Sequence, residues 1–74
     1  MNAEYEKSVG QKIRELRLAR ELTQEQLAAQ MQVKGCDLTR SALAKIEAGQ
    51  RHIYVDELKA AAEVLRVPVS ELLN

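Results

Sequence analysis

Apolar residues in this chain recur at helical spacing, in short segments separated by capping and turn residues. The first two stripes consist of Val9, Ile13, Leu16, Leu27, Ala28 and Met31. This spacing places the apolar side chains on one face of an α-helix. Because helices shorter than about 12–15 residues are marginally stable on their own, such segments must pack together on a shared core. The pattern predicts an all-α fold.

The size of the chain limits it to one domain. Its 74 residues lie near the lower size at which a chain buries a self-sufficient core. Hydrophobic residues make up 46% of the chain and aromatic residues only 3%, so aliphatic side chains must fill that core. Gly and Pro are scarce and no strand-like alternation persists, which argues against a sheet. We expect a single domain over residues 1–74, with its core over about 9–73.

Capping residues indicate where the first helices begin. Ser8 and Gln11 have the spacing of a capping box, and Thr23 and Gln26 have the same spacing. In such a box the hydroxyl accepts a hydrogen bond from a free backbone N–H, and the glutamine reaches back to the N–H of the cap. Thr39 is a further N-cap candidate. Whether residues 3–7 extend the first helix is left open by the pattern.

The remaining boundaries follow from glycine, proline and serine positions. A third helix is expected over Arg40–Ala48, because Gly49 supplies the left-handed residue that commonly follows a helix. A fourth helix is predicted from about Val55 to Leu65. Pro68 then interrupts the chain, and Ser70 is expected to cap a short last turn over residues 71–73. The sequence therefore predicts five helices.

Several functional classes are excluded by what the chain lacks. A single cysteine, Cys36, cannot form an internal disulfide, and with the lone His52 it cannot complete a zinc site. The sequence has no apolar run of about 18 residues and no signal-peptide pattern. No catalytic triad, Cys/His pair or metal-ligand set converges in so few residues. We expect a cytoplasmic protein that is not an enzyme, needs no cofactor and contacts no membrane.

Charge is balanced overall but unevenly distributed. Eleven basic and eleven acidic residues cancel. Residues 34–52 carry four basic and two acidic residues, whereas residues 53–74 carry two basic and four acidic residues. One face can be basic while the molecule is neutral, because salt screens distant charges. The balance predicts modest affinity for nonspecific nucleic acid.

Four segments resemble, in order and spacing, the DNA-binding domain of Cro/C1-type (XRE) helix-turn-helix regulators. They are residues 9–17, 22–28, 40–51 and 65–73. No single segment is specific, but their joint order covers nearly the whole chain. The resemblance implies a compact five-helix domain that binds double-stranded DNA through a recognition helix at about residues 40–48.

The resemblance also implies which residues contact DNA. The family's base-facing positions match Arg40, Ser41, Ala42 and Lys45, and its phosphate-contacting positions match Gln24, Thr39, Arg51, His52 and Tyr54. Donors and small residues on a short helix suit the major groove, and the free N–H groups at a helix start suit an anion. Ordinary surface roles remain alternatives for Gln24 and His52, and covering the edge of the core remains an alternative for Tyr54. Arg17 and Glu47 match a structural ion pair between the first and third helices.

Two features depart from the family pattern. Leu27 to Thr39 spans 13 residues, which makes the connection between the second and third helices longer than usual. We expect the inserted segment around residues 33–38 to bulge outside the core and to tolerate change, with Cys36 a small buried or incidental residue. Glu21 also stands where the family often has glycine. In a left-handed conformation, a residue other than glycine costs about 1 kcal/mol.

These inferences favour a transcriptional regulator, with repression as the expected direction, that binds as a symmetric homodimer. We expect exposed leucines near the C-terminus, Leu72 and Leu73, to form the dimer contact, with the N-terminal segment as the rival. A DNA-binding antitoxin, whose key partner is a toxin protein, is an alternative with the same fold. A protein-interaction module that has lost DNA binding is the third possibility.

Overall fold

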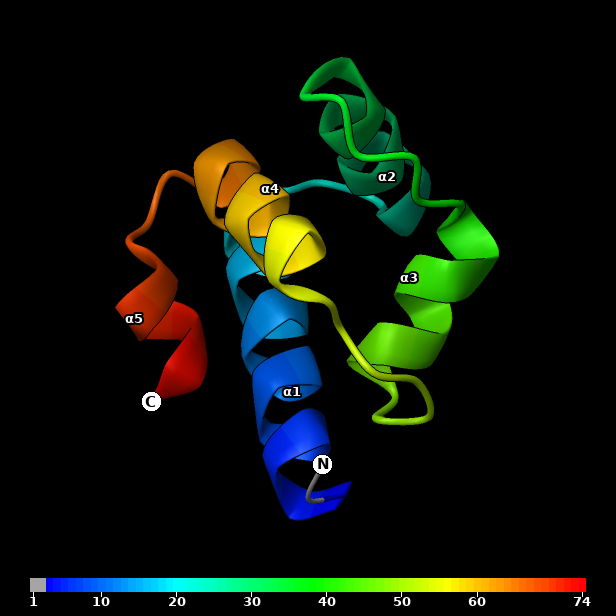
Figure 1. Ribbon diagram of the computed structural model, residues 1–74. Helices are drawn as coiled ribbons and strands as arrows, with labels where there is room; N and C mark the ends of the chain where they lie inside the picture. The colour runs from blue at the N-terminus through cyan, green and yellow to red at the C-terminus, as the bar shows by residue number, and fades with distance from the viewer. Residues whose placement is uncertain (1–2) are drawn as a thin grey trace.

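The computed structural model describes residues 3–74, which form five helices and no strand (Figure 1). The helices are α1 (Ala3–Ala19), α2 (Gln24–Val33), α3 (Arg40–Glu47), α4 (Val55–Leu65) and α5 (Val69–Leu73). The predicted all-α fold of five helices is therefore confirmed. Within this part of the chain, no helix has the length and apolar character needed to cross a membrane.

One core lies between the helices. The long helix α1 runs through the middle of the molecule, with α3 on one side and α5 on the other, and α4 packs across it (Figure 1). The largest fully buried side chains come from every helix and from the α2–α3 connection: Val9, Ile13, Leu27, Met31, Leu38, Leu43, Ile46, Leu65 and Leu72. Full burial of each such side chain contributes about 1.5–3 kcal/mol. The stripes that predicted the helices thus meet in a single interior.

The first helix begins earlier than its capping pattern predicts. α1 includes Ala3, and Ser8 lies exposed inside the helix rather than at its cap. The side chain of Gln11 does not reach back to Ser8 but donates to Glu15 Oε2 at 3.4 Å. The capping box predicted at Ser8 is therefore wrong, and the extension over residues 3–7, which the sequence left open, is present.

This extension of α1 contacts the turn that follows α3. Lys7 packs against Gly49 so closely that a β-carbon on Gly49 would lie 2.4 Å from Lys7 Cγ. Next to this contact, the imidazole of His52 meets the carboxylate of Glu6. These partners are distant in sequence, so tertiary packing stabilises the first turns of α1.

The starts of α2 and α3 follow the sequence prediction. Gln26 N donates to Thr23 Oγ1 at 3.0 Å, and Thr23 N donates to Gln26 Oε1 at 2.9 Å, which completes the capping box. At α3, Ala42 N donates to Thr39 Oγ1 at 3.1 Å. Gly49 follows α3 with a φ of +73°, the left-handed conformation expected there. Local signals were sufficient at these positions.

The lengthened connection between α2 and α3 carries core residues. Gly35, at a φ of +88°, closes α2, and Cys36 N donates back to Met31 O at 3.0 Å. This turn sends Cys36 and Leu38 inward, to exposed fractions of only 8% and 1%. The prediction that residues 33–38 lie wholly outside the core is therefore wrong, although Val33 is 85% exposed. The interpretation of Cys36 as a small buried residue is confirmed.

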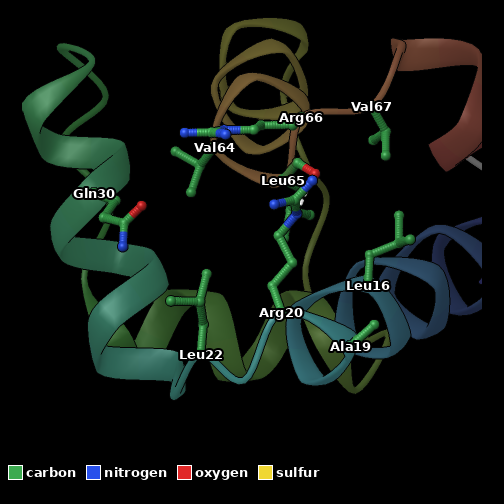
Figure 2. A pocket seen from close by; sticks show the side chains of 9 residues that line it. All are labelled: Leu16, Ala19, Arg20, Leu22, Gln30, Val64, Leu65, Arg66 and Val67. Atoms are coloured by element: carbon green, nitrogen blue, oxygen red, sulfur yellow. Dashed lines mark hydrogen bonds between the residues drawn. The ribbon is translucent and has the colours of Figure 1, made fainter.

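Two residues other than glycine end helices in the left-handed region. Glu21, which stands where the family often has glycine, follows α1 with a φ of 58°, and Arg66 ends α4 with the same φ. Arg20 connects these two helix ends, since its Nε donates to the Leu65 carbonyl at 2.7 Å. Figure 2 shows Arg20 reaching from the end of α1 to the end of α4 across a hollow of about 570 Å³. The ends of α1 and α4 are thereby joined.

The last helix differs from the prediction in two respects. α5 begins at Val69 with Pro68 as its N-cap residue, so Ser70 lies inside the first turn and does not cap it. Leu72 is fully buried, at 0% exposure, and belongs to the core. Its predicted role in a dimer contact is wrong, because α5 is docked on α1 and α4 through this residue. Leu73 remains 40% exposed.

Candidate nucleic-acid interface

The outward face of α3 presents hydrogen-bond donors. Leu43 and Ile46 are buried on its inner face, whereas Arg40, Ser41 and Lys45 are exposed. Among the residues that the structure describes, the side chains of Arg40 and Lys45 have no hydrogen-bond or ion-pair partner. Their charged groups are therefore available to a ligand. An α-helix with such a face has the width that the DNA major groove admits.

The structure does not bring all four predicted base-facing residues to this surface equally. Ala42 is half-buried and packs against the hydrophobic core. Ala44, one turn after Arg40, is also half-buried, and its small side chain does not project from the helix. The exposed face therefore consists mainly of Arg40, Ser41 and Lys45, with Ala42 at its edge.

A buried ion pair attaches this helix to α1. Arg17 Nε donates to Glu47 Oε2 at 2.8 Å, and Arg17 Nη2 donates to Glu47 Oε1 at 3.0 Å. The remaining guanidinium nitrogen donates to the Leu22 carbonyl at 2.7 Å. Both charged groups are thus hydrogen-bonded on several sides, which buried charges require. The contact holds the C-terminal end of α3 at a defined place on α1.

Gln24 joins the same network. It is the first residue of α2, and its Nε2 donates to Glu47 Oε1 at 3.1 Å. The Gln24 side chain is therefore already oriented by α3, while its backbone belongs to the helix start that favours an anion. Thr39 is exposed at the start of α3, where its oxygen caps the helix.

The turn after α3 contains a second organised cluster. Arg51 forms a two-pronged ion pair with Glu57, at 2.9 Å and 3.0 Å, and also donates to the His52 carbonyl at 2.7 Å. The guanidinium carbon lies 5.6 Å from the centroid of the Tyr54 ring, within the range of a cation–π contact. Arg51, His52 and Tyr54 are thus brought together, as the family resemblance implies.

Sequence reasoning missed Glu57, the residue that organises this cluster. Glu57 is buried at the third position of α4, and its Oε1 accepts a hydrogen bond from Tyr54 N at 2.9 Å. Burial alone would raise the pKa of this carboxyl, but the hydrogen bonds from Arg51 and Tyr54 N outweigh burial and hold the pKa below its ordinary value. A glutamate three residues after a helix N-cap was the available signal.

The other shifted groups in this region follow from the same pairing. The hydrogen bond to Glu57 raises the pKa of Arg51 further, so its guanidinium stays charged. Burial, with the nearby charges of Glu57 and Asp56, raises the pKa of the Cys36 thiol. A thiol with a raised pKa is a poor nucleophile, which agrees with a packing role for Cys36.

Acidic residues around the α3 face are engaged in internal contacts. Glu47 pairs with Arg17, Glu57 with Arg51, and the Glu6 carboxylate meets His52. The cations on the face itself, Arg40 and Lys45, are in contrast exposed. The α3 face thus presents two exposed cations on a chain of zero formal net charge.

A family model described as "Helix-turn-helix" matches residues 13–72 of this chain. The chain belongs to that family, in its Cro/C1 (XRE) type. Its function is DNA binding in the regulation of transcription. The family and the fold are those of DNA-binding regulators and not of enzymes.

Two curated relatives are similar in sequence. The control protein C.BamHI of Bacillus amyloliquefaciens is 35% identical over 66 residues, which are 88% of this chain and 75% of that protein. The HTH-type transcriptional activator BcrR of Enterococcus faecalis is 36% identical over 64 residues. The match covers 86% of this chain but only 29% of BcrR, so this chain corresponds to a part of that activator.

Two solved structures have the same fold over nearly their whole length. The restriction-modification controller protein C.AhdI from Aeromonas hydrophila superposes with a TM-score of 0.84 at 33% identity, covering 95% of this chain and 94% of that one. The DNA-binding domain of BldD gives a TM-score of 0.82 at 30% identity, with complete coverage of both chains. The helix arrangement is thus the one used by DNA-binding regulators.

Proposed function

We propose that residues 1–74 form a single domain that recognises a specific duplex sequence by inserting α3 into the major groove. The observation that carries this proposal is the exposed face of α3, where Arg40 and Lys45 have no internal partner among the described residues. The buried pair of Arg17 and Glu47 holds that face in place. Preorganisation of this kind lowers the entropic cost of binding.

Base edges are read by the exposed side chains of α3. A guanidinium such as Arg40 pairs with O6 and N7 of guanine, and the ammonium of Lys45 donates to the same acceptors. Ser41 donates to or accepts from a neighbouring base, and Ala42 contributes an apolar contact at the edge of the helix. Each well-paired base contact is worth about 1–3 kcal/mol of discrimination.

The phosphate backbone is contacted on both sides of α3. Gln24 is the first residue of α2, Thr39 is the N-cap of α3, and Arg51, His52 and Tyr54 lie in the turn that follows α3. Arg51 reaches phosphate while it stays paired with Glu57, because a guanidinium has five donors and its bonds to Glu57 and to the His52 carbonyl use three of them. Such contacts set orientation and are independent of sequence.

The domain acts as a homodimer on two half-sites. A single helix of eight residues offers little surface for selective affinity, and twofold pairing places two such helices about 34 Å apart along the duplex. Leu73 of α5, which is exposed, is the proposed centre of the contact between subunits. Occupancy of a promoter by this dimer represses transcription by blocking polymerase.

A selection experiment tests this function. Duplexes bound by the protein are enriched from a random library, and the affinity for an enriched duplex is compared with that for its shuffled sequence at about 150 mM salt. We expect at least a thousandfold preference and two chains per duplex by sedimentation. Absence of enrichment would indicate an interaction module that has lost DNA binding, and stoichiometric co-purification with a small toxin would indicate an antitoxin.

A further inference from the structure

A groove of about 740 Å³ lies directly beside the face of α3. It runs between α1, the first residue of α2 and the C-terminal half of α3. The side chains that matter for its chemistry are Lys7, Gln11, Arg14, Gln24, Ala44 and Ala48. Three helices therefore contribute to this groove, including α1, to which no DNA contact has been assigned above.

The chemistry of the groove favours an anion at its Arg14 end. Arg14 is exposed and has no hydrogen-bond or ion-pair partner within residues 3–74. Lys7 lies two turns earlier on the same face of α1, about 10 Å away along the axis. Both cations therefore line one wall of the groove.

The acidic residues near Arg14 do not cancel its charge. Glu47 also lines the groove, but its carboxylate is neutralised by Arg17. Glu4 lies at the far end, about 15 Å from Arg14 along the helix, which is more than the screening length of about 8 Å at physiological salt. Glu15 points into a separate hollow that it shares with Lys12.

The position of the groove matches the path of a DNA strand. An α-helix about 10–12 Å across fills a major groove about 12 Å wide, so the two strands must pass on opposite sides of α3. The turn containing Arg51 lies on one side. The groove lies beside Ala44 of α3 and Ala48, the C-cap residue of α3, and the small size of these two side chains allows a strand to approach α1 closely.

We propose that this groove seats one phosphodiester strand of the bound duplex and that Arg14, supported by Lys7, contacts its phosphates from α1. The inference rests on the proposed insertion of α3 and extends it to a helix outside the helix-turn-helix pair. Because phosphates are the same in every sequence, this contact strengthens binding without selecting bases. It adds a cationic contact from α1 to the phosphate contact already proposed for Arg51 in the turn after α3.

The test compares Arg14→Gln with a matched control, Lys59→Gln, which removes an exposed cation from α4. Fluorescence anisotropy is measured on an enriched duplex and on its shuffled sequence over a range of salt concentrations. We expect Arg14→Gln to weaken both duplexes by the same factor, about tenfold, and to lower the salt slope by about one unit per subunit. Lys59→Gln should change neither the affinity nor the salt slope. Arg14→Lys, which keeps the positive charge, should retain most of the salt slope.

Three outcomes would overturn the inference, and they are distinguishable from failure of the proposed function. If Arg14→Gln leaves affinity and slope unchanged while Arg40→Ala weakens the enriched duplex, the groove holds no strand although α3 reads DNA. If the loss is confined to the enriched duplex, Arg14 contacts a base and not phosphate. If neither substitution affects binding, the insertion of α3 is itself wrong. Thermal melts of each variant establish that the domain remains folded.

Discussion

Gly10 of α1 touches the backbone of α3 at the carbonyl of Ile46. A β-carbon on Gly10 would lie 2.1 Å from that oxygen, and 3.0 Å from the carbonyl oxygen of Glu47. Both neighbours are backbone atoms at the end of a helix, so they cannot move aside as a flexible side chain would. The close approach of α3 to α1 therefore requires that position 10 carries no side chain.

Gly10→Ala should push α3 away from α1 and destabilise the domain by about 1–3 kcal/mol, the usual cost of overpacking. Affinity for an enriched duplex should fall with it, since the reading helix is displaced. Urea unfolding and anisotropy measure the two effects. Gly35→Ala is the control, because a β-carbon there meets nothing within 4 Å. Only the left-handed strain of about 1–2 kcal/mol should lower its stability. Its DNA affinity, measured where the variant is fully folded, should not change.

Arg17→Met and Glu47→Leu should each cost about 3–5 kcal/mol of unfolding free energy, because each leaves a buried charge without its partner. The double variant Arg17→Met with Glu47→Leu should be much closer to the parent protein, since it leaves no unpaired charge. Urea titrations of the four proteins supply the comparison. Additive losses in the double variant would show that the pair is not coupled as the 2.8 Å contact implies.

The Arg51–Glu57 pair predicts a dependence of stability on pH. The folded-state pKa of Glu57 is lowered from its ordinary value of 4.5, so its contribution is fully present above that value and is lost as the pH falls through 4.5 toward the folded-state pKa. Urea midpoints measured from pH 6 down to about pH 3 should decline in this window. Glu57→Gln should flatten the decline, whereas Glu63→Gln, at an exposed site of α4, should leave its shape unaltered.

Leu38→Ala should destabilise the domain by about 2–5 kcal/mol, as expected for truncation of a fully buried leucine. Val33→Ala, at the last residue of α2 and 85% exposed, should change stability by less than about 0.5 kcal/mol. Thermal unfolding of both variants distinguishes the two positions. If both substitutions lowered the unfolding free energy equally and only slightly, Leu38 would make no important core contact.

Arg40→Ala should cost about 1–3 kcal/mol on an enriched duplex and relax the base preference at one position of each half-site. Arg51→Ala should instead weaken enriched and shuffled duplexes alike and reduce the salt slope by about one unit per subunit. Because Arg51→Ala also exposes Glu57 without its partner, these measurements are made well below the melting temperature of that variant. An equal loss on both duplexes for Arg40→Ala would remove it from the base-reading set.

The parts of the fold that could be predicted are those with local causes. The capping box of Thr23, the cap at Thr39 and the left-handed Gly49 depend on neighbours within a few residues, and all three form as predicted. The pairing of Arg17 with Glu47 could be expected from the family pattern, although the two residues are 30 positions apart.

The features that could not be predicted depend on contacts between distant segments. The early start of α1 depends on Glu6 meeting His52, which is 46 positions away. Burial of Leu38 and Leu72 depends on where the connection and α5 dock, and polarity patterns in short segments do not determine docking. For the same reason the groove beside Arg14 has no signature in sequence, because it exists only once three helices have assembled.

Leu38 has a consequence for how this connection can change in length. Leu38 is buried immediately before Thr39, the N-cap of α3. The start of α3 is therefore held by a core contact, and its position does not depend on the length of the preceding connection. The tip at Lys34 and Gly35 faces open space. The length of the connection can thus change without changing the position of α3. We expect a peptide or reporter inserted at this tip to leave the operator preference of the protein intact.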